Sequence, residues 1–160
     1  STPGADMQPA WAPDSSQLAV VSDWYAYDFV WDIFLISADG SGFSALTDGN
    51  IFDRRDYVEP AWSPDGSRLA LGVTSRRGIF EFETQIGVMD ANGSNLKLLP
   101  GTAGTSASDL YAGAPSWSPD GTMIAYSTCN GGRCDIRWIK ADGSEYGEIV
   151  RNAMHPDWQR

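Results

Sequence analysis

The sequence patterns that usually indicate catalysis are missing from this 160-residue chain. Its one histidine, His155, lies beside a proline in a repeated motif near the end of the sequence. The sequence has no Gly-x-Ser-x-Gly motif, which would hold a nucleophilic serine, and no histidine and carboxylate spacing typical of a metal centre. We therefore predict that the protein is not an enzyme and has no catalytic residue, metal site or cofactor.

The two cysteines favour a disulfide rather than a reactive site. Cys129 and Cys134 flank the turn-forming residues 130–133 (Asn-Gly-Gly-Arg) between two β-like runs, so a hairpin would place their sulfur atoms opposite each other. Two alternatives stay open: a pair of free thiols in a reducing compartment, and half of a metal site that lacks a second Cys/His pair. A disulfide predicts an extracytoplasmic location, either periplasmic or secreted.

Two kinds of residue are candidates for binding a partner. The segment 22–31 is dense in aromatic residues, which are enriched at protein interfaces and at surfaces that stack on sugars. Two pairs of adjacent arginines could bind carboxylates of a partner. The alternatives are that the aromatic rings pack on a neighbouring unit and that the arginines pair with nearby acidic residues. The candidate partner-binding residues are Trp24, Tyr25, Tyr27, Phe29, Arg54, Arg55, Arg76 and Arg77.

Tryptophan and aspartate recur at fixed positions of a repeat. The tryptophans are Trp11, Trp62, Trp117 and Trp158, and the aspartates that follow three of them are Asp14, Asp65 and Asp120. Because the repeat fixes these positions, we expect the tryptophans to pack between repeat units. We expect the aspartates to cap their own turns, which is a commoner role for aspartate in a turn than acid catalysis.

The repeat itself has a proline two residues before the tryptophan and a Pro-Asp turn directly after it. Full copies occupy residues 8–19, 59–70 and 114–125, and a truncated copy occupies 155–158. Each full copy begins a unit of four β-like runs, and the third and fourth runs are joined by Ala-Asp-Gly-Ser or Ala-Asn-Gly-Ser, a strong hairpin signal.

Four-stranded units that recur every 41 to 55 residues, without helical periodicity, predict the blades of a β-propeller. A twelve-stranded β-sandwich is the alternative, but it gives no reason for the same residues to recur in register. We predict one all-β domain over residues 1–160, a partial propeller of three four-stranded antiparallel units and one extra strand. The blades are expected at about 8–58, 59–113 and 114–153, and the extra strand at 154–160.

The Pro-x-Trp-Ser-Pro-Asp-Gly motif and the Ala-Asp-Gly turn resemble the propeller repeats of the TolB family over nearly the whole chain. The resemblance implies that the tryptophan strand is innermost in each blade and that the chain is a non-enzymatic scaffold that binds another protein. Such repeats also occur in prolyl-oligopeptidase-like proteases, so a gating propeller of such a hydrolase is one alternative. A propeller that binds carbohydrate or cell wall through the aromatic segment is the other.

The direction of the strands separates the turns from the variable connections. Both hairpin turns of a unit fall at one end, whereas the connections from second to third run and from unit to unit fall at the other. Only the second end varies in length, and variable loops on a rigid scaffold usually carry binding specificity. We call this end the loop face and predict that it binds the protein partner.

Charge and length limit the remaining possibilities. The chain carries 11 Lys and Arg against 21 Asp and Glu, a net charge of −10, which disfavours binding to nucleic acid and to anionic lipid. No apolar run reaches the roughly 18 residues of a membrane span. Closed propellers typically have about four to eight blades. The three units of this chain are fewer than the smallest of these. We therefore expect further blades, from a longer polypeptide or from another subunit of an oligomer.

Overall fold

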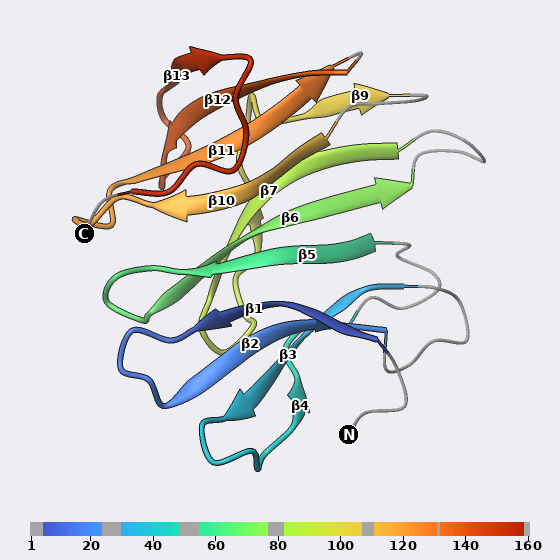
Figure 1. The fold of residues 1–160 in the computed structure, drawn as a ribbon, viewed down its shortest axis with the longest axis vertical. Coiled ribbons are helices and arrows are strands. Elements are labelled where there is room, and N and C mark those ends of the chain that lie inside the picture. Colours follow the sequence, from blue (N-terminus) through green and yellow to red (C-terminus); the bar gives the residue numbers. More distant parts are fainter. Residues whose placement is uncertain are drawn as a thin grey trace.

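The computed structural model describes residues 5–23, 30–48, 55–76, 82–106, 111–130 and 132–158. In this part of the chain the structure is all-β, with thirteen strands and no helix. A search of the same residues accordingly finds no helix that is long and apolar enough to cross a membrane. Three antiparallel sheets lie one above another, with the first sheet at the bottom of Figure 1 and the third at the top.

In each sheet four strands form a meander, in which they pair in the order of the chain. The first sheet consists of β1 (Asp6–Trp11), β2 (Gln17–Ser22), β3 (Asp32–Ser37) and β4 (Ser44–Ala45). The second consists of β5 (Arg55–Trp62), β6 (Arg68–Arg76), β7 (Phe82–Asp90) and β8 (Lys97–Leu98), with β9 (Gly104–Ser106) also paired to β7. The third consists of β10 (Tyr111–Trp117), β11 (Met123–Asn130), β12 (Arg133–Lys140) and β13 (Tyr146–Arg151). The predicted three four-stranded antiparallel units are therefore confirmed.

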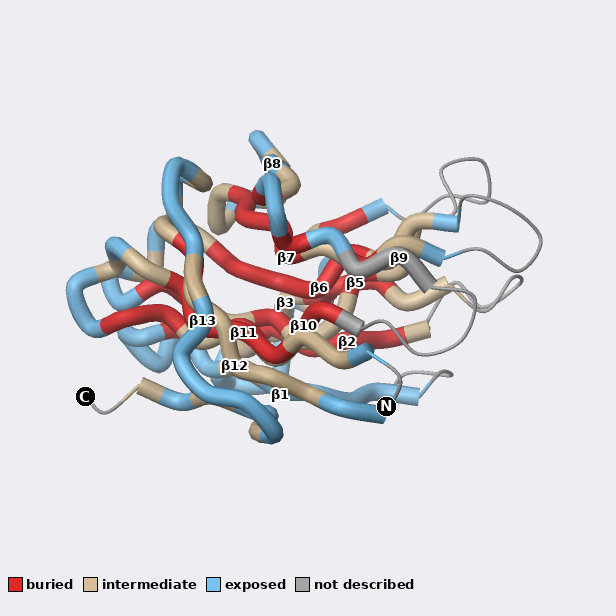
Figure 2. Tube along the Cα trace, turned by 90° about the horizontal axis from the view of Figure 1, so that it is seen from above, coloured by how far each residue is buried: buried red, intermediate tan, exposed pale blue. Residues whose placement is uncertain are grey.

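The middle sheet buries both of its faces, because alternate side chains of a strand point to opposite sides. Leu69 and Leu71 of β6 pack with Ala19 of the first sheet in one apolar cluster. Ala70, between them in sequence, packs with Ile124 of the third sheet in a second cluster. Figure 2 shows the buried residues along β6 and β7, in the middle of the molecule. The two clusters hold the three sheets together.

The two hairpin turns of each sheet lie at the same end, as the sequence predicted. The N–H of Ala38, in the turn between β3 and β4, donates to the carbonyl of Ser16, in the turn between β1 and β2, at 2.9 Å. Ala91 and Ala141 make the equivalent hydrogen bonds in the second and third sheets, each at 2.9 Å. We call this end of the molecule the turn end; it lies opposite the loop face.

The innermost strand of every sheet carries a β-bulge at the residue before the motif proline. Gln8, Glu59 and Ala114 have positive φ angles of 51°, 54° and 49°, and the strand register shifts at each. Proline lacks an N–H donor, so it is tolerated at an edge strand where the ladder is interrupted. His155, the equivalent residue of the truncated copy, has a φ of 56°. The same local backbone conformation therefore recurs four times.

The segment predicted to be the extra strand, 154–160, is described up to residue 158. Residues 153–158 have no strand assignment, although Trp158 Nε1 donates to the carbonyl of Ser116 at 3.0 Å. A strand is defined by pairing with a neighbouring strand, and no described residue pairs with this segment as β2 pairs with β1. The segment keeps the shape of an inner strand but lacks a strand partner.

The prediction that all four repeated tryptophans pack between units is wrong for Trp11. Trp62 and Trp117 are 9% and 6% exposed, whereas Trp11 is 56% exposed. Trp62 Nε1 donates to the carbonyl of Ala10 in the preceding sheet, and Trp117 Nε1 to that of Ala61, both at 3.0 Å. Trp11 belongs to the first sheet, so no preceding sheet exists among the described residues to cover its ring.

Candidate functional site

The structure describes only part of the predicted partner-binding set. Trp24, Tyr25, Tyr27, Phe29, Arg54 and Arg77 lie outside the described residues. Arg55 is the first residue of β5 and faces Ser75 in the strand register. Arg76 is the last residue of β6 and pairs with Phe82, the first residue of β7. Both described arginines therefore lie at the ends of adjacent strands, on the loop face.

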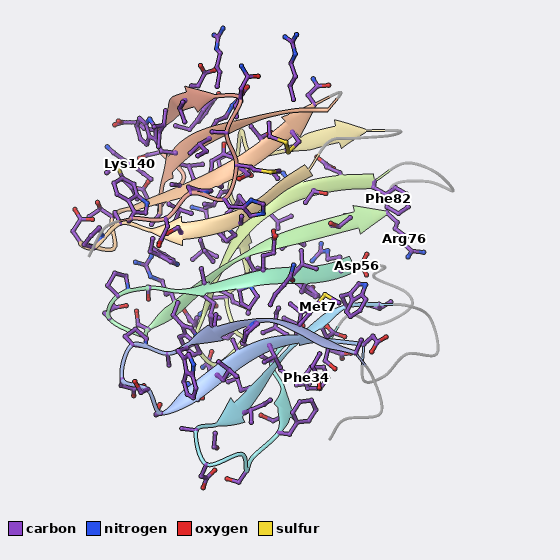
Figure 3. The ribbon with its side chains drawn as sticks, viewed as in Figure 1. Met7, Phe34, Asp56, Arg76, Phe82 and Lys140 are labelled. Carbon is purple, nitrogen blue, oxygen red and sulfur yellow. A yellow bond between two sulfur atoms is a disulfide. The ribbon has the colours of Figure 1, made fainter. Side chains whose placement is uncertain are left out.

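Arg76 stacks on an aromatic ring that the sequence did not single out. Its guanidinium carbon lies 5.7 Å from the ring centroid of Phe82, within the range of a cation–π interaction. Phe82 is 41% exposed, so its ring is accessible to a partner. Figure 3 shows both side chains at the loop face with Asp56 nearby. Only the strand register brings Arg76 and Phe82 together, since their spacing in the sequence gives no such signal.

Asp56 is a half-buried carboxylate beside this pair. Burial raises its pKa above the ordinary value of aspartate, while a hydrogen bond from the N–H of Trp31 and the positive charge of Arg76 oppose that shift. The hydrogen bond joins Trp31 N to Asp56 Oδ1 at 3.2 Å. Asp56 thus links the second sheet to the connection that precedes β3, and it places a negative group next to Arg76.

A second backbone contact fixes the end of the aromatic segment 22–31. The N–H of Tyr57 donates to the carbonyl of Trp31 at 2.7 Å, and Trp31 packs against the cluster between the first two sheets. The residue that ends this segment is therefore anchored to β5, beside Asp56 and Arg55. Sequence reasoning singled out neither Trp31 nor Phe82 as a site residue.

The cysteine prediction is confirmed. Cys129 and Cys134 face each other in the register of β11 and β12 and form a disulfide, with their Cα atoms 3.9 Å apart. The bond closes the hairpin at the loop face of the third sheet. Among the described residues, no group of three or more His, Cys, Asp and Glu side chains is placed to hold a metal ion.

At the turn end, the repeated aspartates accept hydrogen bonds within their own turns, as predicted. Asp65 Oδ1 accepts from the hydroxyl of Ser63 at 2.6 Å and from the N–H of Ser67 at 3.1 Å. These bonds lower the pKa of Asp65 to about 2. Hydrogen bonds of the same kind lower the pKa of Asp14 and of Asp120. The three carboxylates stabilise turns and stay ionised, so they are poor general acids.

Comparison with known proteins agrees with this geometry. The family model described as the TolB beta propeller domain matches residues 1–159. The chain belongs to the TolB β-propeller domain family. Its structure is similar to a TolB-type protein from Agrobacterium tumefaciens, with a TM-score of 0.67 and 20% identity over 98% of this chain. TolB from Acinetobacter baumannii gives a TM-score of 0.65 and 21% identity over 91% of the chain.

The same fold occurs in peptidases. A puromycin-hydrolysing peptidase from Mycobacterium tuberculosis matches with a TM-score of 0.65 and 17% identity over 92% of this chain, which corresponds to 22% of the peptidase. The chain spans 54% of the Agrobacterium protein and 32% of the Acinetobacter protein. At these identities the similarity shows a shared fold only. It does not identify the binding partner of this chain.

Proposed function

We propose that this chain is a non-enzymatic part of a TolB-type propeller scaffold, located outside the cytoplasm, that binds another protein through its loop face. The observation that carries the proposal is the exposed pair formed by Arg76 and Phe82. Aromatic residues and arginine are the types enriched at protein interfaces. The disulfide between Cys129 and Cys134 supports the extracytoplasmic location, because such bonds persist in oxidising compartments.

The position of the arginines supports the choice of this end. Arg55 is the first residue of β5 and Arg76 the last residue of β6, so the described arginine of each pair lies at the same end of two adjacent strands. A chain with a net charge of −10 repels acidic proteins at long range. The guanidinium group of Arg76 beside the exposed ring of Phe82 can nevertheless bind a carboxylate and an apolar side chain together. A partner with an acidic and aromatic or aliphatic binding segment fits this surface.

Further propeller blades are the second part of the proposal. Leu18 and Val20, on the face of the first sheet that points away from the second, are equivalent to Leu69 and Leu71, which contact the preceding sheet. Trp11 is exposed where its equivalents are covered. The third sheet of another copy cannot bind Trp11 in the way that Ala10 and Ala61 bind the next tryptophan. The equivalent acceptor in the third sheet, the carbonyl of Ser116, already accepts a hydrogen bond from Trp158. The covering blade is thus a repeat unit outside these 160 residues.

Site-specific photo-crosslinking in the intact native protein tests the loop-face proposal. A photoreactive residue in place of Phe82 should form adducts with a protein partner, while one in place of Asp142, in an exposed turn at the opposite end, should not. The double variant Arg76→Glu, Phe82→Ala should lower the affinity of the crosslinked partner by about tenfold or more, the scale of one interface hot spot. Equal adducts at both positions, or unchanged affinity of the double variant, would contradict the proposal.

The gating propeller of a hydrolase is the second candidate, supported by the likeness to peptidase propellers in fold. This function needs a catalytic serine on a separate domain of the intact protein. A fluorophosphonate probe distinguishes the two candidates, because it labels activated serines covalently. Labelling of the intact protein would favour the hydrolase; its absence, together with partner adducts at position 82, would favour the scaffold.

A further inference from the structure

A cleft lies at the turn end, between the first and the second sheets. Its volume is about 370 Å³. Residues of one hairpin turn of each sheet line it, together with Trp62. The lining residues that matter here are Pro13, Asp14, Gln17, Trp62, Asp65 and Gly66. The cleft lies opposite the loop face, so it is a separate site from the one proposed above.

Because the motif is repeated, an equivalent position exists between the second and the third sheets. There the guanidinium carbon of Arg68 lies 4.8 Å from the ring centroid of Trp117. Arg68 Nη2 also donates to the carbonyl of Gly121 at 3.4 Å. A guanidinium group from the chain itself therefore rests on the tryptophan and bonds to the turn of the next sheet.

The motif gives the equivalent positions directly. Gln17 and Arg68 each lie six residues after the tryptophan of their repeat, and Trp62 and Gly66 correspond to Trp117 and Gly121. Glutamine is shorter than arginine and uncharged. The residues that line the first cleft include neither lysine nor arginine. Trp62, which is 9% exposed, and Gly66 thus line the first cleft as the equivalents of the residues that Arg68 contacts in the second, but the lining of the first cleft provides no guanidinium group.

Charge around the cleft favours a cation. Asp14 and Asp65 belong to the two turns that form the walls. Hydrogen bonds from Ser16 lower the pKa of Asp14, and those from Ser63 and Ser67 lower the pKa of Asp65 to about 2, so both carboxylates are ionised at neutral pH. The net charge of −10 adds attraction at longer range.

We propose that this cleft binds the guanidinium group of an arginine side chain from a polypeptide partner. A guanidinium fits better than an ammonium, because its flat face stacks on indole while its edge donates to a carbonyl or a carboxylate. The partner is a polypeptide because the cleft opens beside a groove of about 570 Å³ along the inner strands. Pro13, Trp62 and Pro64 line both spaces, so a backbone in the groove places a side chain in the cleft.

Titration of the intact protein with blocked arginine tests the inference. N-acetyl-arginine amide should shift the indole N–H resonance of Trp62 along a saturable curve, and the isosteric neutral N-acetyl-citrulline amide should not. A short peptide of glycines around one arginine should bind at least about tenfold more tightly than blocked arginine, because its backbone also fills the groove. Equal affinity of peptide and amino acid would overturn the polypeptide as the source.

The substitution Gln17→Arg provides the decisive variant. It would place the chain's own guanidinium on Trp62, as Arg68 lies on Trp117, and should abolish binding of blocked arginine while keeping the protein folded. Asn130→Arg is the matched control, since it adds the same charge at an exposed position of the loop face. Binding that survives Gln17→Arg, or that Asn130→Arg removes equally, would overturn the site.

Discussion

At the scale of the residue, the repeated motif uses its polar and aromatic side chains for structure. Asp65 accepts hydrogen bonds from Ser63 and Ser67, and Trp62 donates its indole N–H to the preceding sheet. Neither group is free to transfer a proton or to bind a metal. Function is therefore expected from residues that break the repeat, such as Gln17 where the second repeat has Arg68, or the Arg76 and Phe82 pair at the loop face.

The first prediction concerns Asp65→Asn. The folded pKa of about 2 lies below the ordinary 3.8 of aspartate, so the ionised carboxylate stabilises the fold above about pH 4 and loses that contribution as the pH falls toward 2. Because Asp65 is largely solvent-exposed, screening limits the contribution to roughly 1 kcal/mol. Urea unfolding at several pH values should show a stability difference from wild type at pH 6 that shrinks between pH 4 and 2. A difference that is constant with pH would contradict the assigned role.

A second prediction compares two tryptophans at the same repeat position. Trp62→Ala should lower the free energy of unfolding by about 3–5 kcal/mol, as removal of a buried aromatic side chain does. Trp11→Ala should cost less than about 1 kcal/mol when the 160-residue chain is studied by itself, because 56% of Trp11 is exposed. Thermal or denaturant melts of the two variants measure the difference. Similar losses for both would show that Trp11 is packed in solution.

At the scale of the element, each sheet is specified by its turns and by one contact to its neighbour. Gly93, in the turn between β7 and β8, has a φ of +83°, and a Cβ atom there would overlap the carbonyl oxygen of Leu46 from the first sheet. Gly40 has the same place in the first sheet and a φ of +82°, but no atom lies within 4 Å of its Cβ position. The same turn thus has a neighbour in the second sheet and none among the described residues in the first.

This difference predicts unequal effects of the same substitution. Gly40→Ala should destabilise by about 1 kcal/mol, the usual cost of a positive φ for a residue with a Cβ atom. Gly93→Ala should cost clearly more, about 2–4 kcal/mol, because the backbone of Leu46 must also move. Chemical denaturation of the two variants provides the comparison. If Gly93→Ala is no worse than Gly40→Ala, the two sheets are less closely packed in solution than in the structure.

At the scale of the whole molecule, the arc has two different ends. The first sheet presents Trp11 and Leu18 where an inner sheet would contact a preceding one. The third sheet is partly covered by residues 153–158, in which the N–H of His155 donates to the hydroxyl of buried Ser127 at 2.8 Å. Large apolar side chains are exposed at both ends, among them Trp11 in the first sheet and Tyr146 and Ile149 in the third. We therefore expect further blades to contact both ends of the molecule.

The assembly prediction has two measurements. Light scattering on the isolated 160-residue chain should show self-association, because large apolar side chains such as Trp11, Tyr146 and Ile149 are exposed in it. Oxidative footprinting should then find Trp11 reactive in the isolated chain and as protected as Trp62 in the intact protein. A soluble monomer that does not bind dye probes of apolar surface, with Trp11 equally reactive in both forms, would show that the open arc is sufficient by itself.

The sequence alone determined the units of the fold. The spacing of tryptophan, Pro-Asp and Ala-Asp-Gly fixes where strands begin and turn, because these local signals act within a few residues. It also favoured a hairpin with Cys129 opposite Cys134, because the turn-forming residues between them are a local signal. For the same reason the roles of Asp14, Asp65 and Asp120 were readable: each bonds to residues of its own turn.

Only the tertiary structure decided the contacts between units. The exposure of Trp11 depends on whether a sheet precedes it, and the stacking of Arg76 on Phe82 depends on the register of β6 with β7. The cleft at Gln17 is visible only when two turns from different sheets lie side by side. The spacing of the repeat depends on residues that are close in the sequence. A binding site between repeats depends on which residues of different sheets are packed side by side, and the repeat motif does not specify that.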